Sequence, residues 1–318
     1  MRSVHSWLIE EDRSPSDSGL WIGQVLCPQR LLSWNCSGTK VIAALCFGFA
    51  WLRSLGIFLV MQVVILCGGK GTRLREETEY RPKPMLPIGE QPILWHIMKI
   101  YAHYGHTDFV LCLGYKGEMI KDYILNYRYL NSDLTVHLGQ KREVIFHHGS
   151  DESAWTVTLA GTGEETMTGA RLKRVEKYIQ GDLFMMTYGD GVGDVDVRAL
   201  LEFHRGHGKS ATLTGVRPPG RFGELVSKNN LVIEFNEKPQ TTTGQINGGF
   251  FVFSRKFFDY LTEDPNLILE QSPLRRAAAD GQLMCFGHDG FWQPMDTFRE
   301  FELLNHLWKI NQAPWKVW

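Results

Sequence analysis

The chain has 318 residues, with 34 lysines and arginines against 35 aspartates and glutamates, so its formal net charge is −1. This balance excludes a polybasic protein that binds nucleic acid or a membrane surface, although it leaves room for a local basic pocket. The 43% hydrophobic and 22% charged residues are typical of a globular protein and exclude a disordered or collagen-like chain. Six cysteines without a Cys-x-x-Cys pair indicate neither a disulfide framework nor a zinc site, so we expect a reducing, cytoplasmic location.

The first 60 residues differ from the rest of the chain. They contain only nine charged residues, and residues 1–40 show no helical or strand periodicity. Residues 41–60 are more apolar, but Arg53 interrupts a run that would need roughly 20 apolar residues to span a membrane. We expect residues 1–60 to be an N-terminal extension outside the functional domain, which would comprise residues 61–318. A genuine appendage and a membrane anchor remain the alternatives.

From Met61 onward, strand and helix patterns alternate. Strands are predicted over residues 61–66 and 109–113, and helices over 92–104 and 117–129. This alternation predicts a parallel sheet with right-handed crossover connections. Between residues 134 and 159, shorter alternating runs predict antiparallel or edge strands.

The rest of the chain also shows helix and strand patterns in alternation. Helices are predicted over residues 170–179, 196–207, 256–262, 272–280 and 297–310, and strands over 183–188, 211–216, 231–235, 248–253 and 283–286. No internal repeat or linker-like stretch follows residue 60. We therefore predict a single α/β domain with a mixed, mainly parallel sheet that is flanked by helices.

A glycine-rich segment, Cys67–Arg73, follows the first predicted strand. Its sequence CGGKGTR matches neither the dinucleotide pattern G-x-G-x-x-G nor the P-loop pattern. Its three glycines would still let backbone N–H groups approach phosphate oxygens, and Arg73 could bind a phosphate in a bidentate manner. The alternative is a tight turn with a surface arginine.

Three charged residues lie at positions that favour a ligand site. Lys83 is held between Pro82 and Pro84, which restrict the backbone on both sides; a rigid loop with a solvated lysine is the alternative. Asp190 follows a predicted strand, and the carboxyl ends of strands are where open α/β sheets bind ligands. Asp296 precedes the last predicted helix. A turn residue is the alternative for Asp190, and a helix N-cap for Asp296.

The segments GGKGTRL and RPKPMLPI together resemble the signature of the sugar-1-phosphate nucleotidyltransferase family. Six further segments resemble the members that transfer a cytidylyl group to glucose 1-phosphate: residues 167–174, 188–192, 218–223, 246–251, 291–297 and 313–316. The resemblance runs from Met61 to the C-terminus. It implies a Rossmann-like nucleotidyltransferase fold and the conversion of CTP and α-D-glucose 1-phosphate to CDP-glucose and pyrophosphate, for activated-sugar and surface-polysaccharide biosynthesis.

The same resemblance assigns roles to individual residues. Asp190 and Asp296 would bind Mg²⁺, and Lys83, Arg73 and Asp190 would form the catalytic set. The implied nucleotide-binding residues are Leu66, Cys67, Gly68, Gly69, Lys70, Gly71, Thr72, Arg73, Lys83, Thr166, Arg171 and Gly189. The implied sugar-phosphate-binding residues are Glu237, Lys238, Asn247 and Gly248. The alternatives are a solvated cation for Arg171, an ion pair at a strand end for Glu237 and Lys238, and a strand-entry turn for Asn247.

The expected chemistry needs no Ser-His-Asp set and no general base, because the sugar phosphate is itself an ionised nucleophile at neutral pH. Catalysis would consist of positioning and charge stabilisation. Uridylyl, thymidylyl and guanylyl transfer remain alternatives, since the sequence does not identify the group that contacts the cytosine edge. A glycosyltransferase is disfavoured because no D-x-D pair begins at Asp190. We also expect a homo-oligomer without nucleic-acid or membrane partners.

Overall fold

The computed structural model describes residues 60–71, 74, 78–139, 143–147, 151–218 and 244–318, and the strands at 25–27, 30–32, 224–228 and 231–236. The chain divides into two compact units, Met1–Leu59 and Val60–Trp318. In the first unit the described residues form an antiparallel pair, β1 (Val25–Cys27) with β2 (Arg30–Leu32). Residues 41–59 of the apolar run lie outside the described residues. Across the described part of the chain, no helix has the length and apolar character needed to cross a membrane.

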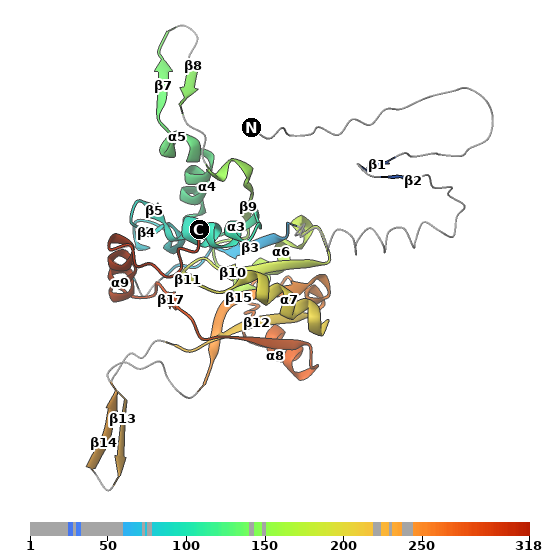
Figure 1. Ribbon diagram of the computed structural model, residues 1–318, viewed down its shortest axis with the longest axis vertical. Coiled ribbons are helices and arrows are strands. Elements are labelled where there is room, and N and C mark those ends of the chain that lie inside the picture. The colour runs from blue at the N-terminus through green and yellow to red at the C-terminus, as the bar shows by residue number, and fades with distance from the viewer. Residues whose placement is uncertain are drawn as a thin grey trace, which may run out of the picture. The chain divides into compact units, whose positions relative to one another are not determined.

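A seven-stranded sheet lies at the centre of the second unit, in the order β16-β12-β15-β10-β3-β6-β9 (Figure 1). All neighbouring strands run parallel except β15, which is antiparallel to both β10 and β12. The prediction of a mixed, mainly parallel sheet is therefore confirmed. The strands are β3 (Gln62–Leu66), β6 (Asp108–Leu113), β9 (Thr156–Gly161), β10 (Leu183–Tyr188), β12 (Ala211–Val216), β15 (Ile246–Ser254) and β16 (Leu283–His288).

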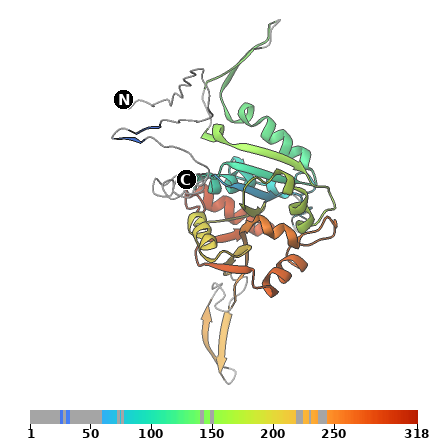
Figure 2. The same ribbon diagram turned by 90° about the vertical axis from the view of Figure 1, so that its right-hand side faces the viewer.

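The central strands β3, β6 and β10 are buried on both faces, which explains why they are runs of apolar residues. Val63 and Ile65 of β3 enter one hydrophobic cluster, whereas Val64 enters another on the opposite face. Helices cover both faces (Figures 1 and 2). The first cluster includes residues of α3 (Ile93–His103), α4 (Gly117–Leu125), α7 (Val197–His207) and α9 (Phe298–Lys309), and the second includes residues of α6 (Thr168–Arg174) and α8 (Ser272–Ala279).

Three predicted helices are wrong in extent or type. The helix expected over residues 117–129 is divided into α4 and α5 (Tyr127–Asn131) at Asn126, whose side-chain amide donates to the Asp122 carbonyl at 2.9 Å. The helix expected over 170–179 ends at Arg174, and a separate 3-10 turn, η4 (Glu176–Tyr178), follows it. The segment expected as a helix over 256–262 is a 3-10 helix, η5 (Arg255–Tyr260).

Short strand pairs lie outside the main sheet. They are β4 (Pro87–Ile88) with β5 (Gln91–Pro92), β7 (Leu134–His137) with β8 (Glu143–Phe146), β13 (Glu224–Lys228) with β14 (Leu231–Asn236), and β11 (Gly191–Gly193) with β17 (Trp292–Pro294). The β11–β17 pair is important for the site, because it joins the segment that follows β10 to the segment that precedes α9.

The topology creates a switch point between β3 and β10. The chain passes from β3 to β6 and β9 on one side, and then returns to place β10 on the other side of β3. Loops that leave the carboxyl ends of two such strands diverge, and the crevice between them is the usual ligand site of an open α/β sheet. The glycine-rich segment follows β3, and Asp190 follows β10.

Candidate active site

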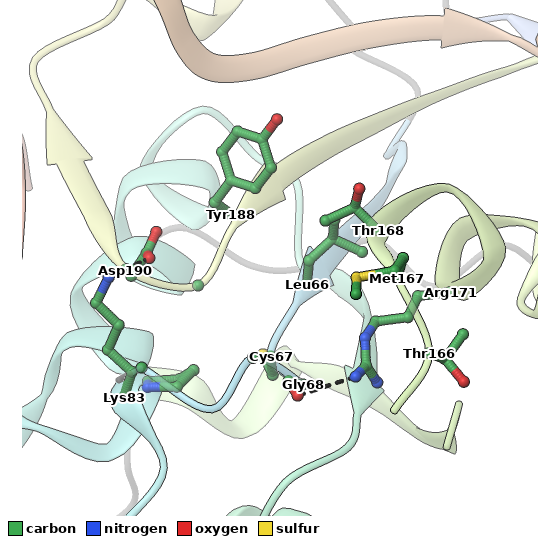
Figure 3. A pocket seen from close by; sticks show the side chains of 14 residues that line it. Leu66, Cys67, Gly68, Lys83, Thr166, Met167, Thr168, Arg171, Tyr188 and Asp190 are labelled. Carbon is green, nitrogen blue, oxygen red and sulfur yellow. Dashed lines mark hydrogen bonds and ion pairs between the residues drawn. The ribbon is translucent and has the colours of Figure 1, made fainter. Parts of the chain in front are cut away.

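A cavity of about 230 Å³ opens at the carboxyl ends of β3 and β10 (Figure 3). Among its lining residues, those predicted from the sequence are Leu66, Cys67, Gly68, Gly69, Gly71, Lys83, Thr166, Arg171, Gly189 and Asp190. The lining residues that the sequence analysis missed are Pro84, Met167, Thr168 and Tyr188. Thr72, Arg73, Glu237 and Lys238 lie outside the described residues. The cavity therefore gathers most of the predicted nucleotide-binding residues.

Gly189 allows the ends of β3 and β10 to approach each other closely. Its backbone N–H donates to the Leu66 carbonyl at 3.1 Å. A Cβ atom on this residue would lie 2.9 Å from that carbonyl oxygen and 3.0 Å from Pro84 Cγ. Any side chain at this position would push the glycine-rich segment or the proline segment away from Asp190.

Lys83 lies between the two predicted metal ligands. Its ammonium donates to Asp190 Oδ2 at 2.6 Å and also to Asp296 Oδ1. The Lys83 side chain is only 11% exposed, against 34% for Asp190 and 21% for Asp296. Burial by itself would lower the pKa of Lys83, but the two carboxylates outweigh it, so the pKa is raised above its usual value. The alternative of a solvated lysine is therefore wrong.

Pairing of β11 with β17 brings Asp296 to Asp190. Gly191 is opposite Pro294, and the Met295 N–H donates to the Asp190 carbonyl at 2.8 Å. The N-cap of α9 is Thr297, which forms a capping box with Glu300. The N-cap alternative for Asp296 is therefore wrong, and its carboxylate instead contacts Lys83.

Arg171 is buried and joins several segments of the chain, so the alternative of a solvated cation is wrong. Its side chain is 4% exposed, and burial lowers the pKa of its guanidinium. The guanidinium donates five hydrogen bonds, of 2.7 to 3.2 Å, to oxygens of three segments of the chain: Gly68 O, Leu113 O, Thr162 Oγ1, Gly163 O and Glu164 O. The bond to Gly68 is drawn in Figure 3. Arg171 thus holds the glycine-rich segment through Gly68, and its side chain also lines the cavity.

Thr166 and Lys70 differ in their surroundings. Thr166 is 6% exposed and its hydroxyl accepts a hydrogen bond from Arg174 at 2.8 Å, so it forms a rigid part of the cavity wall. Lys70 is exposed and forms an ion pair with Glu165 at 2.5 Å. The Lys70 side chain is therefore turned toward the segment before α6, and Lys70 is not among the residues that line the cavity.

The predicted sugar-contacting residues Asn247 and Gly248 lie at the start of β15. The Asn247 amide donates to the Tyr188 hydroxyl at 3.0 Å, and its carbonyl oxygen accepts from the Gly249 N–H at 2.9 Å. The Gly248 carbonyl accepts from Trp292 Nε1 at 2.7 Å. The strand-entry turn and a role in the site are thus compatible, because Asn247 fixes the turn and also contacts Tyr188, which lines the cavity.

The comparison with protein families decides the classification. The model of the family described as "Nucleotidyl transferase" matches residues 62–297. The chain belongs to the nucleotidyl transferase family. The resemblance noted in the glycine-rich and proline segments is therefore confirmed, and the chain is a nucleotidyltransferase enzyme.

Two proteins that are similar in sequence to this chain are described as glucose-1-phosphate cytidylyltransferases, one of them as a probable one. The glucose-1-phosphate cytidylyltransferase of Salmonella typhimurium is 51% identical over 259 residues, which cover 81% of this chain and 100% of that protein. The probable glucose-1-phosphate cytidylyltransferase of Bacillus subtilis is 43% identical over 258 residues, again 81% of this chain and 100% of that protein.

Solved structures support the fold alone, because their identities are low. A putative glucose-1-phosphate thymidylyltransferase from Bacillus anthracis has a TM-score of 0.58 at 20% identity, and covers 78% of this chain and 95% of that one. HddC from Yersinia pseudotuberculosis has a TM-score of 0.57 at 23% identity, with 78% and 100% covered.

Proposed function

We propose that this nucleotidyltransferase transfers the cytidylyl group of CTP to α-D-glucose 1-phosphate, giving CDP-glucose and pyrophosphate. The observation that carries the choice of substrates is the 51% identity to the Salmonella typhimurium glucose-1-phosphate cytidylyltransferase over the whole of that protein. The cavity is consistent with this reaction. It combines a glycine-rich segment, a buried lysine and an aspartate at the topological switch point.

The reaction needs little from the protein beyond positioning and charge. An oxygen of the sugar phosphate attacks the α-phosphorus of CTP, the new P–O bond forms, and the bond between the α- and β-phosphates breaks with its electrons going to pyrophosphate. Lys83 and the backbone N–H groups of the glycine-rich segment would hold the triphosphate and offset its negative charge. Arg171 would keep that segment in place through Gly68. Arg73, Thr72, Glu237 and Lys238 remain predicted contacts to phosphates and sugar.

The residues present fit a divalent cation. Asp190 and Asp296 both contact one ammonium group, so their carboxylates already converge on the position of a single cation. Within the described residues no group of three or more His, Cys, Asp or Glu could hold a metal, so further ligands would come from substrate phosphates and water. Bound there, Mg²⁺ would neutralise the charge of the phosphates as the α-phosphorus is attacked.

Metal dependence is tested by substituting each carboxylate. Asp190→Asn and Asp296→Asn should each lower turnover by about 100-fold or more, because each removes charge from the cation site. Mn²⁺ binding, followed by electron paramagnetic resonance, should weaken in both variants. Full activity of either variant, or of the unmodified protein in excess EDTA, would contradict the assignment.

The substrates are tested by incubating the purified protein with glucose 1-phosphate and each nucleoside triphosphate in turn, while pyrophosphate release is followed. Release with CTP and formation of CDP-glucose are expected. Release with UTP or dTTP alone would support the alternative, another sugar-1-phosphate nucleotidyltransferase. No release with any nucleotide would refute the proposal. A homo-oligomer, a cytoplasmic location and a role in surface-polysaccharide synthesis remain predictions.

A further inference from the structure

Glu270, just before α8, contacts two side chains that line the cavity. One of its carboxylate oxygens accepts a hydrogen bond from the Tyr188 hydroxyl, and the other accepts from Thr168 Oγ1 at 2.8 Å. Tyr188 and Thr168 both line the cavity, whereas Glu270 itself does not (Figure 3). No sequence motif pointed to Glu270, because it reaches Thr168 and Tyr188 only through the fold.

The carboxylate fixes where the two hydroxyl protons point. An ionised carboxylate only accepts hydrogen bonds, so Tyr188 and Thr168 must both donate to it. Each hydroxyl oxygen also accepts one bond from the protein: Thr168 from the Leu269 N–H at 2.9 Å, and Tyr188 from the Asn247 amide at 3.0 Å. The two oxygens therefore have spare acceptor capacity but no proton left for a ligand.

Hydrogen-bond donors and acceptors therefore lie in different parts of the cavity. Lys83 and the glycine-rich segment provide cationic and N–H donors, which suit phosphate oxygens. The Tyr188 and Thr168 hydroxyls on this wall provide acceptors only, which suit ligand O–H groups and disfavour phosphate. Asn247, which the sequence predicted to contact the hexose, is hydrogen-bonded to the same Tyr188 hydroxyl.

We propose that Glu270 is a positioning residue, which makes the Tyr188 and Thr168 hydroxyls acceptors for a hydroxyl group of the bound hexose. This inference rests on the proposed function, because it takes the hexose of glucose 1-phosphate as the ligand. It adds Tyr188 and Thr168 as specificity-determining residues, and Glu270 as the residue that sets their polarity.

The test uses glucose 1-phosphates in which the 2-, 3-, 4- or 6-hydroxyl is replaced by fluorine, which cannot donate a hydrogen bond. For one of these analogues, the unmodified enzyme should lose about tenfold or more in kcat/KM, the value of a hydrogen-bond acceptor left unpaired. Tyr188→Phe or Thr168→Val should reduce that loss to about threefold or less while leaving the losses for the other analogues unchanged. Comparing ratios between enzymes cancels the electronic effect of fluorine.

Glu270→Gln should change the selectivity among the same fluorinated glucose 1-phosphates. The glutamine amide can donate, so one hydroxyl is free to turn its proton toward the ligand, and the KM for glucose 1-phosphate should rise about five- to tenfold with the KM for CTP unchanged. Glu263→Gln, an exposed glutamate in the same loop, is the matched control and should behave like the unmodified enzyme. Thermal unfolding of each variant establishes that it is folded.

The outcomes separate this inference from the proposed function. If the unmodified enzyme converts CTP and glucose 1-phosphate but Glu270→Gln retains its KM values and its selectivity among the fluorinated sugars, the inference is refuted and the function stands. A rise in the KM for CTP alone would also refute it, because the acceptor wall would then face the nucleotide. If the unmodified enzyme releases no pyrophosphate with CTP, the proposed function fails first.

Discussion

Replacing Lys83 by methionine removes the cation that holds Asp190 and Asp296 together. Two carboxylate oxygens that contact one ammonium lie within roughly 5 Å of each other, and at an effective dielectric constant near 20 their repulsion is about 3 kcal/mol. Because Asp190 is 34% exposed, water screens part of this repulsion, and we expect a net loss of about 2 kcal/mol in the free energy of unfolding. For a domain of this size, that loss corresponds to a melting temperature lower by about 4 to 8 °C.

Thermal unfolding of Lys83→Met at neutral pH, with and without Mg²⁺, measures this effect. Lys83 is fully charged there, because its raised pKa means that its contribution to stability is lost only as the pH rises above the usual lysine value. Mg²⁺ should raise the melting temperature of the variant more than that of the unmodified protein, since the cation site is no longer taken. The double variant Lys83→Met/Asp296→Asn should recover most of the stability while remaining inactive. An unchanged melting temperature in Lys83→Met, together with equal stabilisation by Mg²⁺, would refute this reasoning.

Further predictions concern the supports of the site and the N-terminal extension. Arg171→Lys should lower the free energy of unfolding by about 2 to 4 kcal/mol in urea titrations, because lysine cannot replace five hydrogen bonds, whereas the exposed Arg275→Lys should have no effect. Burial lowers the pKa of His96 to about 4, so the free energy of unfolding falls as the pH drops below about 6.5. His96→Gln should reduce this fall in the free energy of unfolding between pH 7 and 4.5 by about 2 kcal/mol. An unchanged fall would exclude His96 as its source. Deleting residues 1–60 should leave kcat/KM unchanged, because the family match begins at residue 62; aggregated protein would contradict this.

Local patterns were sufficient for most of the fold. The Val and Ile run of β3 is buried on both faces, so its composition alone identified a parallel strand. The helix predicted over residues 170–179 was too long because η4 interrupts the regular turn that a periodic pattern assumes. The break at Asn126 coincides with a side-chain hydrogen bond to the Asp122 carbonyl, which leaves little trace in the hydrophobic pattern.

Part of the site could be predicted from the sequence, but the contacts that join its residues could not. The glycine-rich segment, Lys83 and Asp190 follow from motif and strand position, and the structure brings them to one cavity. That Asp296 meets Asp190 depends on the short β11–β17 pair, which sequence periodicity does not reveal. Glu270 was missed because its function depends on two long-range hydrogen bonds and on no motif of its own.

The ratio of kcat/KM for CTP to that for UTP, with glucose 1-phosphate as the second substrate, tests the central claim most directly. Cytosine presents an amino donor where uracil presents a carbonyl acceptor, so a site built for one leaves a polar group unpaired with the other. We expect CTP to be preferred by at least about tenfold, which corresponds to about 1.4 kcal/mol. Equal values for CTP and UTP would contradict cytidylyl transfer as the specific reaction and leave only the nucleotidyl transferase family.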